Sequence, residues 1–272
     1  MSRSDQNEPQ ARLSGPAPAT PRLELIAVPG LPDFSPGDDL AKAIADGAVM
    51  AGVPLAQGDI VVVAQKIVSK CEGRYADLAS LVPGARAIEL ARVTGKDACL
   101  IEVILADTSE VLRACDGILI VANRAGHVMA NAGVDASNVP SADRPRVLRL
   151  PADADRSALR LRVDLGRRTG TKVAVVINDS WGRAWRNGTV GHAVGAAGLP
   201  ALWDRRGEPD MYGRSLRATQ IGLADEIAAA ASLVMGAAAE RQPVVIVRGY
   251  PLPAADGTAR DLVRDRSRDL FR

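Results

Sequence analysis

The chain has 272 residues, of which 47% are hydrophobic, and its formal net charge is +2, from 34 basic and 32 acidic residues. This length allows one large domain or two modest ones with a sizeable core. The near balance of charge provides no field that would attract nucleic acid or an anionic membrane, and with 3% aromatic residues the chain has little surface for stacking bases. We therefore expect neither of these partners.

The three cysteines are widely spaced and form no Cys-x-x-Cys pair, which argues against a disulfide framework or a zinc knuckle and favours a reducing, cytoplasmic setting. Residues 1–20 lack the apolar core of a signal peptide and are rich in proline, alanine and polar residues, so we expect a disordered tail before a folded region at 21–272. No stretch has the roughly 20 apolar residues of a membrane helix.

Strands and helices alternate along the rest of the chain, with no internal repeat. Apolar, mostly β-branched runs predict strands at 23–28, 60–64, 172–177 and 244–247. Apolar residues at helical spacing predict helices at 40–50, 85–115 (as two or three short helices), 157–168 and 224–235. Runs at 117–123 and 127–131 flank a short polar segment and predict a hairpin. This order indicates an α/β or α+β fold and leaves the sheet topology open.

Some elements allow finer expectations. Asp38 or Asp39 is placed to cap the helix at 40–50. The helix at 157–168 is expected to expose its arginines, and its predicted apolar surface consists of Leu159, Val163 and Leu165. The strand at 172–177 is expected to end in Asn178-Asp179-Ser180, with a loop after it that holds Trp181, Gly182, Arg183, Trp185 and Arg186.

Familiar nucleotide and hydrolase motifs are absent. The sequence has no phosphate-binding Gly-x-x-x-x-Gly-Lys-[Ser/Thr] loop, and no Gly-x-Gly-x-x-Gly follows a strand. Neither histidine stands at metal-ligand spacing from a Cys or Glu, and we expect His127 to be structural. Gly191, Gly195 and Gly198 are expected to allow close packing or turns rather than to cradle a phosphate.

Small polar clusters follow three of the expected strands. They are Asp179-Ser180, Asp135 with Asn138, and Lys66 with Lys70. Ligands of open α/β sheets gather beyond the carboxyl ends of strands, and carboxylate and hydroxyl oxygens suit Mg²⁺ or Mn²⁺. The lysines would supply positive charge to a phosphate chain. An Asp after a strand is more often a turn or helix-cap residue than a ligand, so only the number of these clusters points to a site.

Seven strings of the sequence together resemble one protein family. They are Val-Pro-Gly-Leu-Pro at 28–32, Gly-Asp-Asp-Leu at 37–40, the stretch 58–74 that ends in Ser-Lys-Cys-Glu-Gly-Arg, Asn-Ala-Gly-Val-Asp-Ala-Ser-Asn at 131–138, the stretch 176–188, Tyr-Gly-Arg-Ser-Leu at 212–216 and Ala-Asp-Glu-Ile at 224–227. In this order they closely resemble the coenzyme F420-0:L-glutamate ligases, also called gamma-glutamyl ligases. The resemblance covers about residues 23–250.

The resemblance implies a fold and a reaction. The fold would be the two-lobed, mixed sheet-and-helix arrangement particular to this family, formed by residues 21–272 as an intertwined homodimer. The reaction would join L-glutamate to the lactyl carboxylate of the deazaflavin coenzyme and then add gamma-linked glutamates through an acyl phosphate. GTP would be the co-substrate, with Mg²⁺ or Mn²⁺ and K⁺ as cofactors.

The same resemblance assigns residues. Asp135, Asp179 and Ser180 match metal ligands, and the expected catalytic residues are Asp135, Asp179 and Lys70. The matched nucleotide contacts are Pro29, Gly30, Leu31, Pro32, Ala64, Gln65, Lys70 and Asn138, followed by Met235, Gly236, Ala237, Ala238, Ala239, Glu240, Arg241 and Gln242.

Two positions depart from the family pattern. Ala237 stands where relatives can carry an acidic metal ligand, and Gln220 stands where many have Glu. We expect water to complete the coordination of one ion, unless Glu240 replaces the missing carboxylate. Two alternatives to the ligase remain open: a deazaflavin- or nucleotide-binding homologue without turnover, and an amide ligase of the same mechanism that acts on a different carboxylate.

Overall fold

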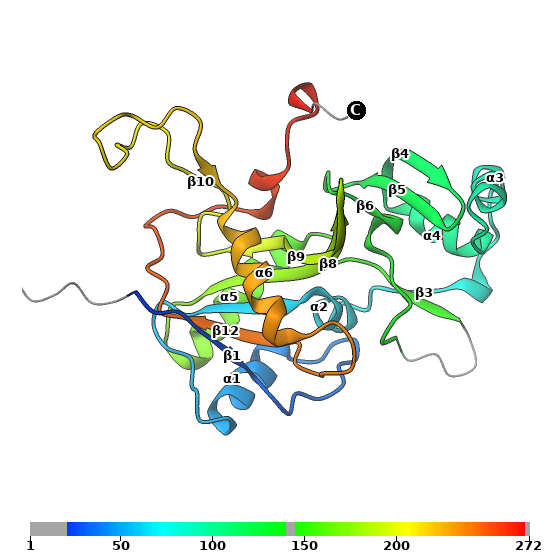
Figure 1. Ribbon diagram of the computed structural model, residues 1–272. Coiled ribbons are helices and arrows are strands. Elements are labelled where there is room, and N and C mark those ends of the chain that lie inside the picture. Colours follow the sequence, from blue (N-terminus) through cyan, green and yellow to red (C-terminus); the bar gives the residue numbers. More distant parts are fainter. Residues whose placement is uncertain (1–20, 140–144, 270–272) are drawn as a thin grey trace, which may run out of the picture.

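A five-stranded mixed sheet forms the centre of the structure (Figure 1). The structure, a computed structural model, describes residues 21–139 and 145–269, so the predicted disordered tail at 1–20 lies outside the described residues. The strands in spatial order are β1 (Glu24–Ala27), β12 (Val244–Arg248), β2 (Ile60–Ala64), β8 (Ala174–Arg183) and β9 (Arg186–Ala197). β2 and β8 are parallel, and the other neighbouring pairs are antiparallel.

Helices cover both faces of this sheet, which explains the continuous apolar runs of its inner strands. Helices α1 (Leu40–Met50), α2 (Gln65–Cys71) and α5 (Ala154–Thr169) pack on the face that carries Val61 and Val63. Helix α6 (Leu223–Met235) packs on the opposite face, which carries Val62. The predicted α/β class is therefore confirmed.

The helices begin and end close to the positions predicted from the sequence, but the residues that they bury were predicted less well. Asp39 caps α1, because its side chain accepts a hydrogen bond of 2.9 Å from the Lys42 amide. In α5, Leu165 is buried as predicted, but Leu159 and Val163 are 48% and 40% exposed. The sheet is contacted instead by Leu161, four residues before Leu165 and on the same side of the helix.

Residues 75–139 and 145–148 form a smaller α+β part beside the central sheet (Figure 1). Its elements are β3 (Tyr75–Asp77), α3 (Ala85–Thr94), α4 (Ala98–Ala106), β4 (Thr108–Cys115), β5 (Ile118–Asn123), β6 (Val128–Ala130) and β7 (Arg146–Leu148). A core of its own includes Leu90, Ile101, Ile104 and Leu119. The predicted hairpin is confirmed as β5 and β6.

Two sequence-based predictions of local structure are wrong. Residues 108–115 form strand β4 rather than helix, because β5 supplies a neighbouring strand for them. The expected loop after Ser180 is a β-hairpin, in which Trp181 pairs with Val190 and Gly182 with Thr189. β8 therefore does not end at Asp179 but runs past the end of its neighbour β2.

Glycines allow α6 and α5 to lie close to β9. A Cβ atom at Gly191 would lie 2.2 Å from Ser232 Oγ of α6, and one at Gly195 would lie 2.4 Å from the Ala154 carbonyl oxygen of α5. The predicted packing role is confirmed for these glycines.

The remaining elements are short. The ribbon of β10 (Trp203–Asp204) and β11 (Gln220–Ile221) extends from the sheet, and the 3-10 turns are η1 (Leu78–Ser80), η2 (Asn131–Gly133), η3 (Ala259–Leu262) and η4 (Arg266–Arg268). No helix in the described ranges is long and apolar enough to cross a membrane.

Candidate active site

One edge of the central sheet brings together segments that are distant in the sequence. β1 and β2 end at this edge, β12 begins there, and β8 passes it, since Asn178 is in register with Ala64. The Val28 amide donates to the Val244 carbonyl at 2.9 Å, and the Ala64 amide donates to the Pro243 carbonyl at 2.8 Å. The loop after β1, the start of α2, the segment before β12 and Asp179 therefore meet at one place.

Asp135 reaches this edge from the smaller part and is held by Lys66 of α2. Lys66 Nζ lies 2.7 Å from Asp135 Oδ2 and 2.6 Å from Ser137 Oγ. The Ser137 amide donates to Asp135 Oδ1 at 2.7 Å. Burial raises the pKa of Asp135, but the hydrogen bonds from Lys66 and Ser137 outweigh it and lower the pKa below its usual value. Asp135 is therefore a carboxylate at neutral pH.

Asp179 of β8 is the second carboxylate at this edge of the sheet, and it forms a cluster with Asp135 and Lys66. Burial, with a further contribution from the charge of Asp135, raises its pKa to about 6, against the opposing effects of the Ser180 amide and of Lys66. The charges of both Lys66 and Asp135 therefore affect the pKa of Asp179. A carboxyl group that is costly to ionise beside another carboxylate is stabilised as an anion when a cation binds between them.

Asp179 and Ser180 point to opposite faces of the sheet, because successive side chains alternate along a strand. Asp179 is paired with His192, on the face of α2. Ser180 is paired with Gly191, on the face where Ser232 of α6 lies. The two members of the predicted metal-binding pair therefore present their side chains to different neighbours.

Lys70, one turn further along α2, is buried with 9% of its surface exposed. Unlike Lys66, it forms no ion pair or hydrogen bond through its ammonium group with any described residue. The ammonium group stays accessible at the end of this largely buried side chain, so an anionic ligand would be able to pair with it.

In the loop after α6, the exposed side chain of Glu240 bends back to the main chain of its own loop. Glu240 Oε2 accepts a hydrogen bond of 2.7 Å from the Ala238 amide. This amide, and then those of Glu240 and Ala237, lower the pKa of Glu240. Glycine is favoured at Gly236 because its φ of 76° is one that other residues rarely adopt. The main-chain N–H groups of this loop thus face an anion.

Glu240 does not lie one helical turn beyond the preceding helix, because α6 ends at Met235. Glu240 therefore cannot reach a metal as a residue of an extended α6, and the alternative that assumed this is wrong. Arg241 instead ties the loop to the segment after β1, through an ion pair of 3.0 Å with Asp33.

The family of the chain follows from a match over most of its sequence. The model of the family described as F420-0:Gamma-glutamyl ligase matches residues 30–249. The chain belongs to this family.

Its relatives include proteins named coenzyme F420:L-glutamate ligase. The chain is 46% identical over 252 residues to that of Methanothermobacter thermautotrophicus, covering 92% of this chain and 99% of the relative. It is 44% identical over 256 residues to that of Methanopyrus kandleri, covering 93% and 98%. For Methanocaldococcus jannaschii the identity is 40% over 251 residues, covering 92% and 97%. The resemblance inferred from the sequence is confirmed.

The other residues matched to gamma-glutamyl ligase contacts lie around the same edge, and their roles stay predictions. The segment Pro29–Pro32 is a largely exposed loop after β1. Gln65 is buried at the start of α2, where its Oε1 accepts a hydrogen bond of 3.0 Å from Ser69. Asn138 is exposed in the loop of Asp135, with a positive φ of 55°. Gln220 lies elsewhere, in the β10–β11 ribbon.

A divalent ion at this gamma-glutamyl ligase site would need ligands from outside the chain. Among the described residues, no group of three or more His, Cys, Asp or Glu side chains is placed to hold a metal. Two carboxylates, Asp135 and Asp179, are nevertheless enough for Mg²⁺ when phosphate oxygens and water fill the other positions.

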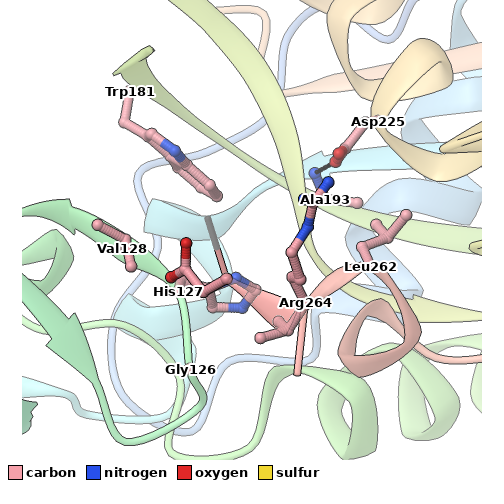
Figure 2. A pocket seen from close by; sticks show the side chains of 10 residues that line it. Gly126, His127, Val128, Trp181, Ala193, Asp225, Leu262 and Arg264 are labelled. Atoms are coloured by element: carbon pink, nitrogen blue, oxygen red, sulfur yellow. Dashed lines mark hydrogen bonds between the residues drawn. The ribbon is translucent and has the colours of Figure 1, made fainter. Parts of the chain in front are cut away.

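Sequence reasoning missed a pocket beside the cluster, with a volume of about 280 Å³. Figure 2 shows His127, Val128 and Trp181 around one side of it and Asp225, Leu262 and Arg264 around the other. Trp181 stacks on His192 at 4.1 Å between ring centroids, and His127 lies 5.8 Å away on the same measure. Burial lowers the pKa of His127, so its ring is neutral at pH 7. The signal available in the sequence was the position of Trp181, two residues after Asp179 and therefore on the same face of a strand.

Proposed function

We propose that this protein is a GTP-dependent amide ligase that joins L-glutamate to the lactyl carboxylate of coenzyme F420-0 and then adds gamma-linked glutamates. The main support is the meeting of Asp135, Asp179, the unpaired Lys70 and the loop after α6 at one edge of the sheet, in a member of the gamma-glutamyl ligase family. The names of the relatives suggest the two substrates that are joined.

The chemistry explains why such a site is needed. A carboxylate is a poor electrophile, and transfer of the GTP gamma-phosphoryl group to its oxygen releases GDP and forms an acyl phosphate. The amino nitrogen of glutamate, after losing a proton, attacks the carbonyl carbon and expels phosphate. No protein nucleophile takes part, and phosphoryl transfer depends mainly on positioning and on neutralisation of charge.

The residues of the cluster suit these roles. Asp135 and Asp179 would hold Mg²⁺ or Mn²⁺, which neutralises charge on the transferred phosphoryl group. Lys70 would compensate phosphate charge from α2, and the N–H groups around Ala238 would face further phosphate oxygens in place of the Glu240 carboxylate. A requirement for K⁺ follows from the family alone, and we assign it to no residue.

The intertwined homodimer and the two-lobed family fold are also part of this proposal. Support for the dimer comes from the β10–β11 ribbon, which extends from the sheet (Figure 1). The chain between these two strands exposes the large side chains of Met211 and Tyr212. A second copy of the chain would cover such side chains. Measurement of the mass in solution by light scattering tests this part.

The experiment that tests the activity is direct incubation with the deazaflavin lactyl phosphate, GTP, Mn²⁺ and L-glutamate, followed by mass spectrometry. Stepwise additions of one glutamyl residue, abolished by excess chelator and absent with ATP, are expected. Binding of GTP and coenzyme without any product would indicate a homologue without turnover. GTP consumption that depends on another carboxylate would indicate a ligase with a different acceptor.

A further inference from the structure

A second cavity of about 310 Å³ lies between the smaller part and α5. Charged side chains of both signs line it: Arg74, Arg124, Arg149 and Arg260 with Asp107, Asp153 and Asp155. Four guanidinium groups face three carboxylates, so the cavity has one net positive charge. None of these residues belongs to the metal and nucleotide cluster described above.

By their contacts, most of these charged residues fall into two groups, which line two parts of the cavity wall. Arg149 forms a two-pronged ion pair with Asp107, with Nε at 2.6 Å from Oδ2, and Arg74 lies 3.9 Å from the same carboxylate. Two guanidinium groups therefore share one carboxylate, and all three side chains are about three-quarters buried. Arg124, which also lines the cavity, has no ion-pair partner among the described residues.

Arg74 is held in place independently of that carboxylate, because its Nε donates to the Leu150 carbonyl at 2.9 Å. Burial and the nearby charge of Arg149 lower the pKa of Arg74, opposed by Asp107 and Glu72. Glu72 itself is engaged by Arg160 at 2.6 Å. The wall formed by Arg74 and Arg149 therefore retains uncompensated positive charge that an additional carboxylate would neutralise.

The wall formed by the second group, Asp153, Asp155 and Arg260, is acidic. Asp155 accepts main-chain hydrogen bonds from Ala196 at 2.9 Å and Ala259 at 2.8 Å through one oxygen. Asp153 caps α5 in the same way through one oxygen. The second oxygens of both face the single guanidinium of Arg260, at 3.5 Å from Asp153 and 3.9 Å from Asp155. This wall leaves an excess of negative charge.

The cavity lies close to the cluster of Asp135, Asp179 and Lys66, because hydrogen-bonded backbone connects Asp135 to the arginines of the cavity. Leu148 pairs with Tyr75 of β3 and also with Asp135. The next residue, Arg149, donates its amide to the carbonyl of Arg74 at 3.0 Å. Asp135 and the arginine wall are thus anchored on neighbouring positions of the same short strands.

From this geometry we infer that the cavity is the binding site of the incoming L-glutamate, with its carboxylates at Arg74 and Arg149 and its amino group toward Asp153 and Asp155. Glutamate carries two carboxylates and one ammonium group, so its net charge of −1 matches the cavity. The acidic wall disfavours a polyphosphate. This inference rests on the proposed ligase function, since it names the amino-acid subsite of that reaction.

The test uses Arg74→Gln, which removes the charge and retains a donor toward Leu150, with Arg206→Gln in the β10–β11 ribbon as the matched control. Steady-state assays should show the KM for L-glutamate raised about 10- to 100-fold in Arg74→Gln, the range for loss of one charged hydrogen bond. The KM values for GTP and coenzyme should stay unchanged, and Arg206→Gln should match the wild type.

A second measurement separates this site from the reaction. Calorimetric titration with L-glutamate, in the presence of Mg²⁺ and a non-hydrolysable GTP analogue, should give weaker binding for Arg74→Gln and equal or tighter binding for Asp107→Asn, which frees both guanidinium groups. Glutarate, which lacks the amino group, should bind more weakly than glutamate.

The outcomes can be distinguished. Unchanged glutamate KM and affinity in a folded Arg74→Gln would overturn the subsite while the ligase function stands. A raised KM for the coenzyme instead would assign the arginines to the coenzyme phosphate and also overturn it. If the wild type forms no product but Arg74→Gln still weakens glutamate binding, the subsite stands and the proposed reaction fails.

Discussion

The ammonium group of Lys66 lies 2.7 Å from Oδ2 of Asp135, and this ion pair joins helix α2 of the central sheet to the loop of the smaller part that carries Asp135. Without a bound cation, Lys66 is the counter-ion of Asp135. A divalent ion at Asp135 and Asp179 would take over that role and free Lys66 for phosphate.

Loss of either carboxylate should therefore reduce turnover far more than stability. We expect Asp135→Asn and Asp179→Asn each to lower kcat at least ~10²-fold, as for loss of a preorganised electrostatic group. The partly exposed Lys66–Asp135 pair should contribute no more than about 1 kcal/mol to folding. Steady-state rates and thermal unfolding check this. An early-melting variant with wild-type activity would show that the aspartate is structural.

The stability of the metal-free protein should depend on Asp179 between pH 4 and 6. Its pKa in the folded protein is about 6, above the ordinary 3.8, so the folded state holds a proton that the unfolded state loses. The free energy of unfolding should thus fall as pH rises through this window, by about 1–3 kcal/mol. Asp179→Asn should lose this dependence and be more stable than the wild type at pH 7.5. Equal pH profiles of denaturant unfolding for both proteins would contradict the prediction.

Lys70→Met should keep the fold and lose nucleotide affinity. The stem of this side chain is buried while its ammonium group stays accessible and has no counter-ion among the described residues, so an apolar side chain of similar length should keep the packing. We expect an unchanged melting temperature and a KM for GTP raised at least ~10-fold. The conservative variant Lys70→Arg is the control that retains charge. A normal KM for GTP in Lys70→Met would exclude this lysine as a phosphate contact.

The metal concentration needed for activity should change when Ala237 is replaced by a carboxylate and should not change when Glu240 loses its charge. Glu240 is engaged by main-chain N–H groups of its own loop, so Glu240→Gln should leave the metal concentration for half-maximal activity unchanged. Ala237→Glu should lower it, by adding a carboxylate where water is expected. Titrations with Mn²⁺ measure both. The opposite pattern, in which only Glu240→Gln shifts the titration, would identify Glu240 as the metal ligand.

Local features of the sequence were enough to predict much of the fold. The β-branched run of β2 and the cap of α1 by Asp39 depend on neighbouring residues, and both are confirmed. The family was also determined by sequence, because the strings around Lys70 and Asp135 are long and specific. Strand β4 was not predictable in the same way, since its hydrogen bonds are made to β5 and its helical spacing carried no information about that partner.

The arrangement of the site was decided by the tertiary structure. Sequence placed Asp179 and Ser180 side by side, but the continuation of β8 into a hairpin turns their side chains to opposite faces of the sheet. Arg74 and Arg149 carry no common motif, and they meet only because β3 and β7 pair in the register that joins Tyr75 to Leu148. Strand register is set by contacts between distant segments, so a shift of one residue would have turned these side chains away from the cavity.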